Sequence, residues 1–121
     1  AFTVELGKVS PFGQNDMTKF LEVRETLSRL IAAQDLSLKV YIKEDFNIFT
    51  ISQIINRTKE DFSLNFDDDT PNFTDFPVGY EIANDGGEPY TIKDTGEAII
   101  FPNAKVALGQ RALLTVIPTE I

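Results

Sequence analysis

The distribution of apolar and polar residues predicts one helix near the start of the chain. From Met17 onward, apolar residues recur at three- and four-residue spacing, which indicates one stripe of an amphipathic helix. Asn15 or Asp16 supplies a side chain suited to the N-cap, and we expect the helix to end near Ala33. Before it, residues 2–6 form a mainly apolar run that predicts a short buried strand.

Beyond the helix, the spacing of apolar residues changes to the alternation that is typical of strands. Leu38, Val40 and Ile42 alternate with more polar residues and predict a half-buried strand. Further strands are predicted over 48–56, 62–66, 79–83, 90–93, 98–101 and 112–117. The sequence Asn-Asp-Gly-Gly at 84–87 indicates a hairpin turn. Short strands separated by turns favour a small barrel or sandwich.

Together these patterns predict an α+β chain in two parts. Residues 1–33 would contribute a strand and the amphipathic helix, and residues 34–121 would form a mostly antiparallel β domain. Glycines recur near the ends of the last predicted strands, as in barrel-sandwich hybrid domains of the biotinyl/lipoyl type, because glycine permits tight corners.

Composition narrows the range of partners. The 121 residues carry a net charge of -8, which argues against nonspecific binding to nucleic acid or to anionic membrane surfaces. The chain contains no long apolar span. Because it has no cysteine, no disulfide can form, which fits a cytoplasmic location. A chain of this length buries roughly two-thirds of its unfolded surface, which is enough for a core.

Two acidic features are candidates for chemistry. Glu5 lies inside the apolar run, where an unpaired carboxylate is unfavourable, so it is either a salt-bridged structural residue or a general base. Asp67, Asp68 and Asp69 suggest calcium, but the spacing lacks the glycine and the bidentate glutamate of an EF-hand loop. An acidic solvated loop is the better interpretation of these three residues.

Several segments, taken in order, resemble the succinylglutamate desuccinylase/aspartoacylase family of zinc hydrolases. The first are Glu-Leu-Gly-Lys at 5–8 and Pro-Phe-Gly-Gln-Asn-Asp-Met at 11–17. The later ones lie at 61–64, 67–69, 72–74, 79–80, 85–87, 101–106 and 109–112. Each motif alone is weak, and their order and spacing together carry the resemblance across nearly the whole chain.

This resemblance implies a C-terminal fragment of an enzyme that hydrolyses N2-succinylglutamate to succinate and glutamate in arginine catabolism. Residues 1–33 would end the zinc-hydrolase domain, and residues 34–121 would be the C-terminal β domain. The family binds zinc through two histidines and a glutamate. The chain has no histidine, so we expect no metal site in it, no tight zinc binding and no activity of the fragment alone.

The resemblance also implies roles for individual residues. In related zinc hydrolases, the glutamate equivalent to Glu5 takes a proton from zinc-bound water and passes it to the leaving amine. Lys8, Glu97 and Lys105 are candidate substrate-binding residues. Residues 99–101 are Ile-Ile-Phe, whereas aspartoacylase-like relatives use an aromatic hydroxyl in this segment. The expected partners are a small acylated amino acid and the missing N-terminal zinc-hydrolase domain.

Other interpretations of the chain stay open at this point. An aspartoacylase-type deacylase would differ only in substrate. A biotinyl- or lipoyl-like carrier would need an exposed lysine at a hairpin tip, for which Lys93 is the candidate, although it lacks the flanking methionine of a biotin motif. A purely structural role is the third alternative, with the β domain forming a lid or an interface in a homo-oligomer.

Overall fold

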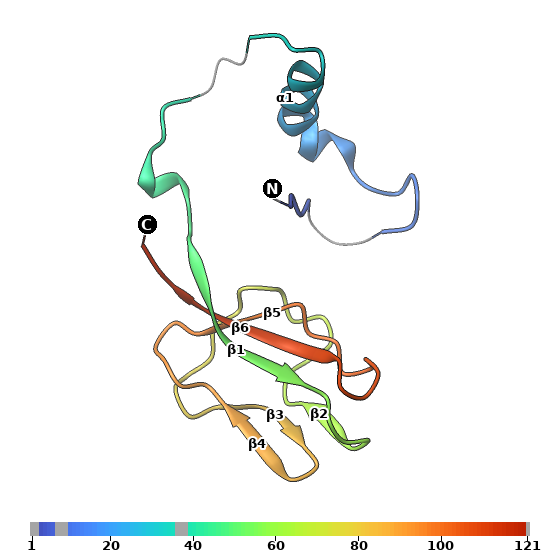
Figure 1. Ribbon diagram of the computed structural model, residues 1–121, viewed down its shortest axis with the longest axis vertical. Helices are drawn as coiled ribbons and strands as arrows, with labels where there is room; N and C mark the ends of the chain where they lie inside the picture. The colour runs from blue at the N-terminus through green and yellow to red at the C-terminus, as the bar shows by residue number, and fades with distance from the viewer. Residues whose placement is uncertain (1–2, 7–9, 36–38, 121) are drawn as a thin grey trace. The chain divides into compact units, whose positions relative to one another are not determined.

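A computed structural model describes residues 3–6, 10–35 and 39–120 of the chain (Figure 1). The chain divides into two compact units, Ala1–Tyr41 and Ile42–Ile121. The boundary between the two units lies between Tyr41 and Ile42, which is C-terminal to the domain boundary that the sequence predicts at residue 33. No helix within the described ranges has the length and apolar character needed to cross a membrane.

The first unit contains the predicted helix in two consecutive pieces. A 3-10 turn, η1 (Met17–Phe20), leads directly into the α-helix α1 (Leu21–Ile31). Asp16 is the N-cap, and its carboxylate accepts a hydrogen bond from the Thr18 N–H at 3.1 Å. The predicted N-cap is thus confirmed. The apolar side chains of α1 are not buried.

The C-terminal end of α1 closes with two backbone hydrogen bonds. The Gln34 N–H donates to the Arg29 carbonyl at 3.0 Å, and the Ala33 N–H donates to the Leu30 carbonyl at 3.2 Å. Ala33 has a φ of 51°, the left-handed conformation that this Schellman arrangement requires. The predicted end of the helix near Ala33 is therefore confirmed.

Two of the predicted strands are wrong. Residues 3–6 are exposed and form no strand, and residue 2 of that prediction lies outside the described residues. Residues 39–42 are likewise exposed and irregular, with Val40 85% exposed, while Leu38 lies outside the described residues. A strand needs a neighbour to accept its backbone hydrogen bonds, and no strand in the described parts of the chain pairs with either segment.

The second unit begins with a short 3-10 turn, η2 (Lys43–Asp45), followed by six strands. The strands are β1 (Phe49–Asn56), β2 (Phe62–Leu64), β3 (Glu81–Asp85), β4 (Glu88–Thr91), β5 (Ala98–Ile100) and β6 (Arg111–Pro118). They form two three-stranded antiparallel sheets, in the orders β1-β6-β5 and β2-β3-β4 (Figure 1). The α+β class with a mostly antiparallel β domain is confirmed.

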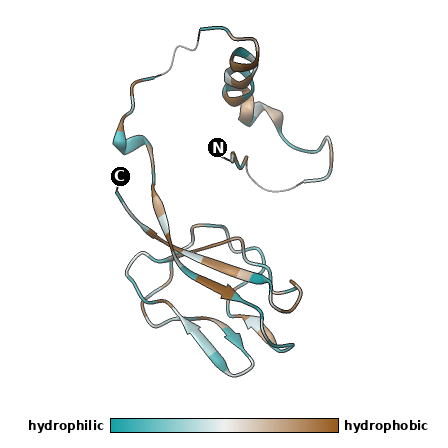
Figure 2. Cartoon of the chain, viewed as in Figure 1, coloured by the Kyte–Doolittle hydropathy of each residue, from teal (hydrophilic) through white to brown (hydrophobic). Residues whose placement is uncertain are grey.

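Both sheets contribute to one hydrophobic core. Ile55, Ile99 and Leu113 come from the β1-β6-β5 sheet, and Phe62 and Ile82 come from the other sheet. All but Phe62 are completely shielded from solvent, and Phe62 is only 8% exposed. Figure 2 shows the corresponding apolar stretches on β1 and β6. Burial of these large side chains, at about 1.5–3 kcal/mol each, is the main stabilising contribution to the β unit.

The loop between β2 and β3 is fixed by aromatic contacts. The ring of Phe73 lies 5.0 Å from that of Phe49, measured between centroids. The ring of Phe76 lies 5.7 Å from Phe66 and 4.8 Å from Tyr80. Such pairs contribute about 0.5–1.5 kcal/mol beyond their area burial. They explain how an acidic, proline-containing loop keeps a defined path.

The turn between β3 and β4 has the predicted two-residue form. Gly86 and Gly87 have φ values of 62° and 91°, and the Asn84 side chain accepts a hydrogen bond from the Gly87 N–H at 2.7 Å. Positive φ at both central residues is the requirement of a type I′ turn. A Cβ added to Gly86 would lie 2.2 Å from Lys59 Cδ and 2.9 Å from Asp61 Oδ1, whereas a Cβ on Gly87 would meet nothing within 4 Å.

This difference predicts unequal effects of alanine in the turn. Gly87→Ala should lower the free energy of unfolding by about 1–2 kcal/mol, because the left-handed conformation is strained for alanine. Gly86→Ala should lower it by about 1 kcal/mol more, because it adds steric overlap. Denaturant titration of both variants measures the two values. Equal losses would show that the space around Gly86 adjusts without strain.

Candidate functional site

The carboxylate of Glu97 lies in the core of the β unit and is surrounded by donors. Its side chain is completely buried. One oxygen accepts from Gln53 Nε2 at 2.7 Å and from the Thr115 hydroxyl. The other accepts from the backbone N–H groups of Lys93, at 2.7 Å, and Asp94, at 3.2 Å. Four hydrogen-bond donors therefore surround one negatively charged carboxylate.

These donors decide the ionisation state of Glu97. Burial by itself raises the pKa of a carboxyl group, but the hydrogen bonds from Gln53, Thr115 and the Lys93–Asp94 backbone outweigh it, so the pKa of Glu97 is lowered. The carboxylate has no face left for a ligand. The prediction that Glu97 binds substrate gains no support from this placement, because all four of these donors belong to the β unit itself.

Asp85 is a second buried carboxylate, at the end of β3, and is 1% exposed. It accepts hydrogen bonds from the Thr58 hydroxyl, from the Thr58 N–H at 3.1 Å and from the Lys59 N–H at 2.9 Å. The Thr58 hydroxyl is the largest cause of the lowered pKa of Asp85. The sequence predicts Asp85 only as a turn residue, because its partner Thr58 lies 27 residues away along the chain.

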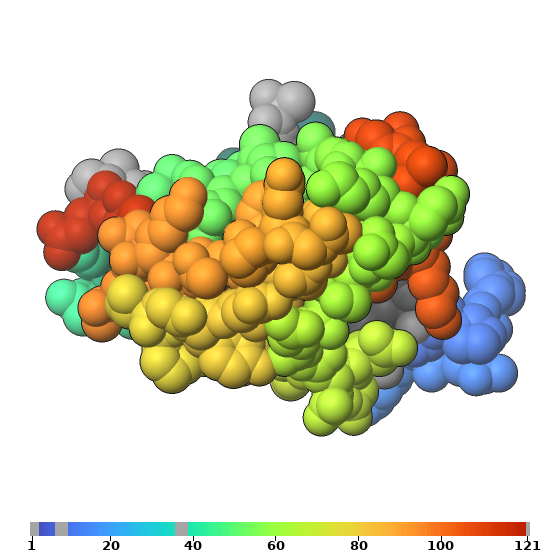
Figure 3. Space-filling view, turned by 90° about the horizontal axis from the view of Figure 1, so that it is seen from below, coloured from blue at the N-terminus to red at the C-terminus, as the bar shows by residue number. Residues whose placement is uncertain are grey.

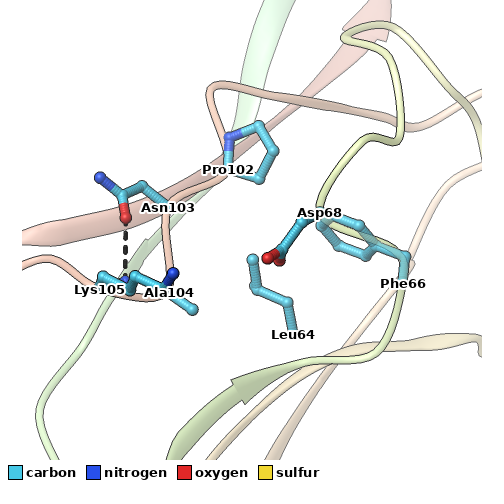
Figure 4. A pocket seen from close by; sticks show the side chains of 7 residues that line it. All are labelled: Leu64, Phe66, Asp68, Pro102, Asn103, Ala104 and Lys105. Carbon is cyan, nitrogen blue, oxygen red and sulfur yellow. Dashed lines mark hydrogen bonds between the residues drawn. The ribbon is translucent and has the colours of Figure 1, made fainter.

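The β unit also has a small surface cavity of about 220 Å³. Its lining residues are Leu64, Phe66, Asp68, Pro102, Asn103, Ala104 and Lys105. Figure 4 shows the Asp68 carboxylate directed toward Leu64, between the two walls of the cavity. The Asn103 side chain accepts a hydrogen bond from the Lys105 N–H at 2.9 Å, which fixes the wall that carries the lysine. The lining thus combines four apolar side chains with one carboxylate, one amide and one ammonium group.

Of the predicted substrate-binding residues, Lys105 is the one that lines this cavity. Glu5 belongs to the first unit, where its side chain is exposed on an irregular segment. Lys8 lies outside the described residues.

The other predicted candidates occupy ordinary surface positions. Lys93 follows β4 in the connection to β5, and these strands belong to different sheets, so it does not occupy the hairpin tip that a carrier lysine needs. Figure 3 shows one face of the unit, on which the orange β3–β4 hairpin lies beside the green segment that follows β1. Residues 67–69 are exposed, as expected of a solvated loop.

The residue types of the chain and their grouping bear on metal binding. Among the residues that the structure describes, no group of three or more acidic side chains is arranged to hold a metal ion. The sequence contains neither histidine nor cysteine, the ligands that zinc prefers. The described residues therefore do not fit a zinc centre.

Comparison with known proteins agrees with the family resemblance seen in the sequence. Residues 44–119 match the AstE/AspA barrel-sandwich hybrid domain. The chain is 54% identical over 121 residues to succinylglutamate desuccinylase of Pseudoalteromonas atlantica, covering 100% of the chain and 35% of the relative. It is 53% identical to the enzyme of that name from Idiomarina loihiensis, covering 99% of the chain and 36% of the relative.

A solved structure shows the same likeness. Succinylglutamate desuccinylase from Vibrio cholerae superposes with a TM-score of 0.81 at 37% identity, over 94% of this chain and 33% of that one. The chain therefore spans about a third of the length of the relatives that it matches. The predicted family resemblance and the predicted barrel-sandwich hybrid domain are both confirmed.

The contacts of Glu97 predict a large loss of stability in Glu97→Gln. An amide keeps only one acceptor oxygen, so its NH2 group faces at least one donor and leaves it unsatisfied. The free energy of unfolding should fall by about 2–3 kcal/mol in denaturant titration. The matched control, Glu44→Gln at an exposed position, should change it by less than about 0.5 kcal/mol. Similar values for both variants would contradict the structural role.

The lowered pKa values also predict a pH dependence. In the folded state, the pKa values of Glu97 and Asp85 are lowered from their ordinary values of 4.5 and 3.8. The contribution of these two groups to stability is therefore complete above those ordinary pKa values. It should be lost as the pH falls through the lower, folded-state pKa values. Unfolding monitored between pH 7 and 2 should therefore show the difference between wild type and Glu97→Gln shrinking in acid. A difference that stays constant would be inconsistent with this assignment.

Proposed function

This chain belongs to the family of the AstE/AspA barrel-sandwich hybrid domain, and from that membership we propose that it is part of a zinc-dependent amidohydrolase acting on N2-succinylglutamate. The reaction would consume water and release succinate and glutamate, as a step of arginine catabolism in the cytoplasm. The small-molecule partner is the acylated amino acid. The protein partner is the N-terminal zinc-hydrolase domain, outside these 121 residues.

The proposal rests on how much of this chain is similar to its relatives. The domain match begins at residue 44, yet the identity of 54% to a protein named succinylglutamate desuccinylase runs over all 121 residues. The segment with Glu5 is included in that alignment. A β module that had been reused in an unrelated protein would share only the domain itself. The relatives are named succinylglutamate desuccinylases, which likewise favours the succinyl substrate over an aspartoacylase-type one.

We assign the general base to Glu5. Its exposed carboxylate would take a proton from the water whose oxygen attacks the amide carbonyl carbon. As the carbon–nitrogen bond breaks, the same carboxyl group would return that proton to the leaving amine. Lys8 and Lys105 are proposed contacts for the carboxylates of the substrate, and the placement of Lys105 beside a cavity supports its part.

The zinc ion would be held by residues outside this chain. The support is chemical, because the chain has no histidine and no cysteine and its described acidic residues are not grouped as ligands. The 121 residues alone are accordingly proposed to have no turnover and no tight zinc binding. The β unit would contribute shape and substrate contacts rather than metal ligands.

Glu5→Gln in the full-length protein tests the assignment of the base. Hydrolysis of N2-succinylglutamate should fall by at least about 100-fold in kcat, because an amide cannot accept the proton, while KM changes little. Zinc content, measured on the same samples, should be unchanged. The matched control is Glu22→Gln, an exposed glutamate in α1, which should keep wild-type turnover.

The possible results separate the alternatives. Full activity in Glu5→Gln would place the base elsewhere, and loss of zinc along with activity would make Glu5 a ligand or a fold support. A wild-type protein that ignores the succinyl substrate but hydrolyses an N-acyl aspartate would point to the aspartoacylase-type reaction. Turnover by the isolated 121 residues would contradict the proposal that the catalytic machinery lies largely outside them.

A further inference from the structure

The β1-β6-β5 sheet has an apolar outer face in addition to the face that forms the core. One face forms the hydrophobic core through Ile55, Ile99 and Leu113. Residues that pair directly across an antiparallel sheet point to the same side, so the strand register identifies the opposite face. This outer face consists of Ile51, Ile54, Ala98, Ile100, Leu114 and Val116. None of the six carries a polar or charged group.

Part of the outer face is covered from within the unit. Phe49 lies two residues before Ile51 on β1 and points to the same side, and its ring meets that of Phe73, 5.0 Å away. Val116 is 4% exposed and Leu114 is 5% exposed. The cover is incomplete, however, because Ile51, Ile54 and Phe73 are 55%, 62% and 56% exposed.

Phe73, which contacts Phe49 on this surface, and Phe101, which directly follows β5, both have strained backbone conformations. Phe73 and Phe101 have φ values of 66° and 53°, which are unfavourable for residues with a Cβ. The Phe73 N–H donates to the Ile99 carbonyl at 2.7 Å, and the Phe101 N–H donates to the Asn72 side chain at 2.9 Å. These hydrogen bonds fix the positions of two rings whose surfaces are about half exposed and so are not buried within the unit.

An antiparallel sheet that faces water on one side normally alternates apolar and polar residues. A contiguous apolar face instead marks a surface that is covered in the working protein. Because the outer face has no charge, a strongly charged partner such as nucleic acid does not match it. Its occupant must be apolar.

We propose that the outer face packs against a part of the same polypeptide that lies outside these 121 residues. About two thirds of the length of the matched relatives has no counterpart in this chain, and a protein of that length would have enough additional polypeptide to cover the face. A covalently linked segment also has an effective concentration in the millimolar range, which favours it over a second copy. The inference rests on the proposed function only in placing the chain within a longer desuccinylase-type protein.

Cysteine labelling of the full-length protein tests this packing. The 121 residues contain no cysteine, so Ile54→Cys introduces one reporter on the outer face. Val78→Cys is the matched control, because Val78 is 58% exposed and lies in the loop before β3. Alkylation rates of the peptides with these residues are measured by mass spectrometry, in native buffer and in urea.

In native buffer, Ile54→Cys should react at least tenfold more slowly than Val78→Cys, and the two should react equally in urea. Ile51→Cys provides an independent second position on the face. Equal native rates at all positions would overturn the proposal. The labelling does not depend on turnover, so protection of Ile54→Cys in a protein inactive on N2-succinylglutamate would contradict the proposed function alone.

A photo-crosslinking residue at position 54 then identifies the occupant. Crosslinks to peptides of the same polypeptide outside the 121 residues are the expected result. Crosslinks confined to peptides within the 121 residues, including those of a second copy, would overturn the proposal. Light scattering across a range of protein concentrations separates a second copy from an intramolecular contact.

Discussion

A buried, ionised glutamate joins three parts of the β unit that are distant in the sequence. Gln53 from β1, Thr115 from β6 and the backbone that follows β4 all donate hydrogen bonds to Glu97. An isolated carboxylate in a protein interior is strongly unfavourable, so the fold is stable only when all of these donors are in place. The connection from β4 to β5, which crosses from one sheet to the other, is fixed by the same carboxylate.

A bulge in β1 makes this arrangement possible. The register with β6 shifts between Ile51 and Gln53, so one extra residue, Ser52, interrupts the alternation. Without it, Gln53 would share the side of Ile51. With it, Gln53 points inward to Thr115 and Glu97, and Ile54 points outward. The polar network in the core and the apolar outer face of the β1-β6-β5 sheet therefore have a common structural origin.

The sequence predicted much of the fold because its strongest signals are local. The Asp16 N-cap, the end of the helix at Ala33 and the Gly86–Gly87 turn each depend on a few neighbouring residues, and all are found. The strands expected over 2–6 and 38–42 depend on partners that no local pattern contains, and in the described residues these partners are absent. Alternation alone could not reveal the bulge at Ser52.

The site was harder to predict for a related reason. Glu97 and Asp85 look like surface residues in the sequence, since nothing near them reveals that Gln53 and Thr58 will be their partners across the fold. Cavity-lining Lys105 could be named only through the family resemblance, and Glu5 keeps its proposed role by the same route. Residue types suggest chemistry, but long-range pairing decides which carboxylates remain available for it.

The buried carboxylates of the β unit bear on where the proposed catalysis can take place. Glu97 and Asp85 are held ionised by dense donor sets, and a carboxylate with a lowered pKa is a weak base. A general base needs a free oxygen and a pKa closer to the working pH. Neither buried carboxylate meets this requirement. The β unit is thus suited to provide a surface, and the proton transfer proposed for Glu5 would take place outside it.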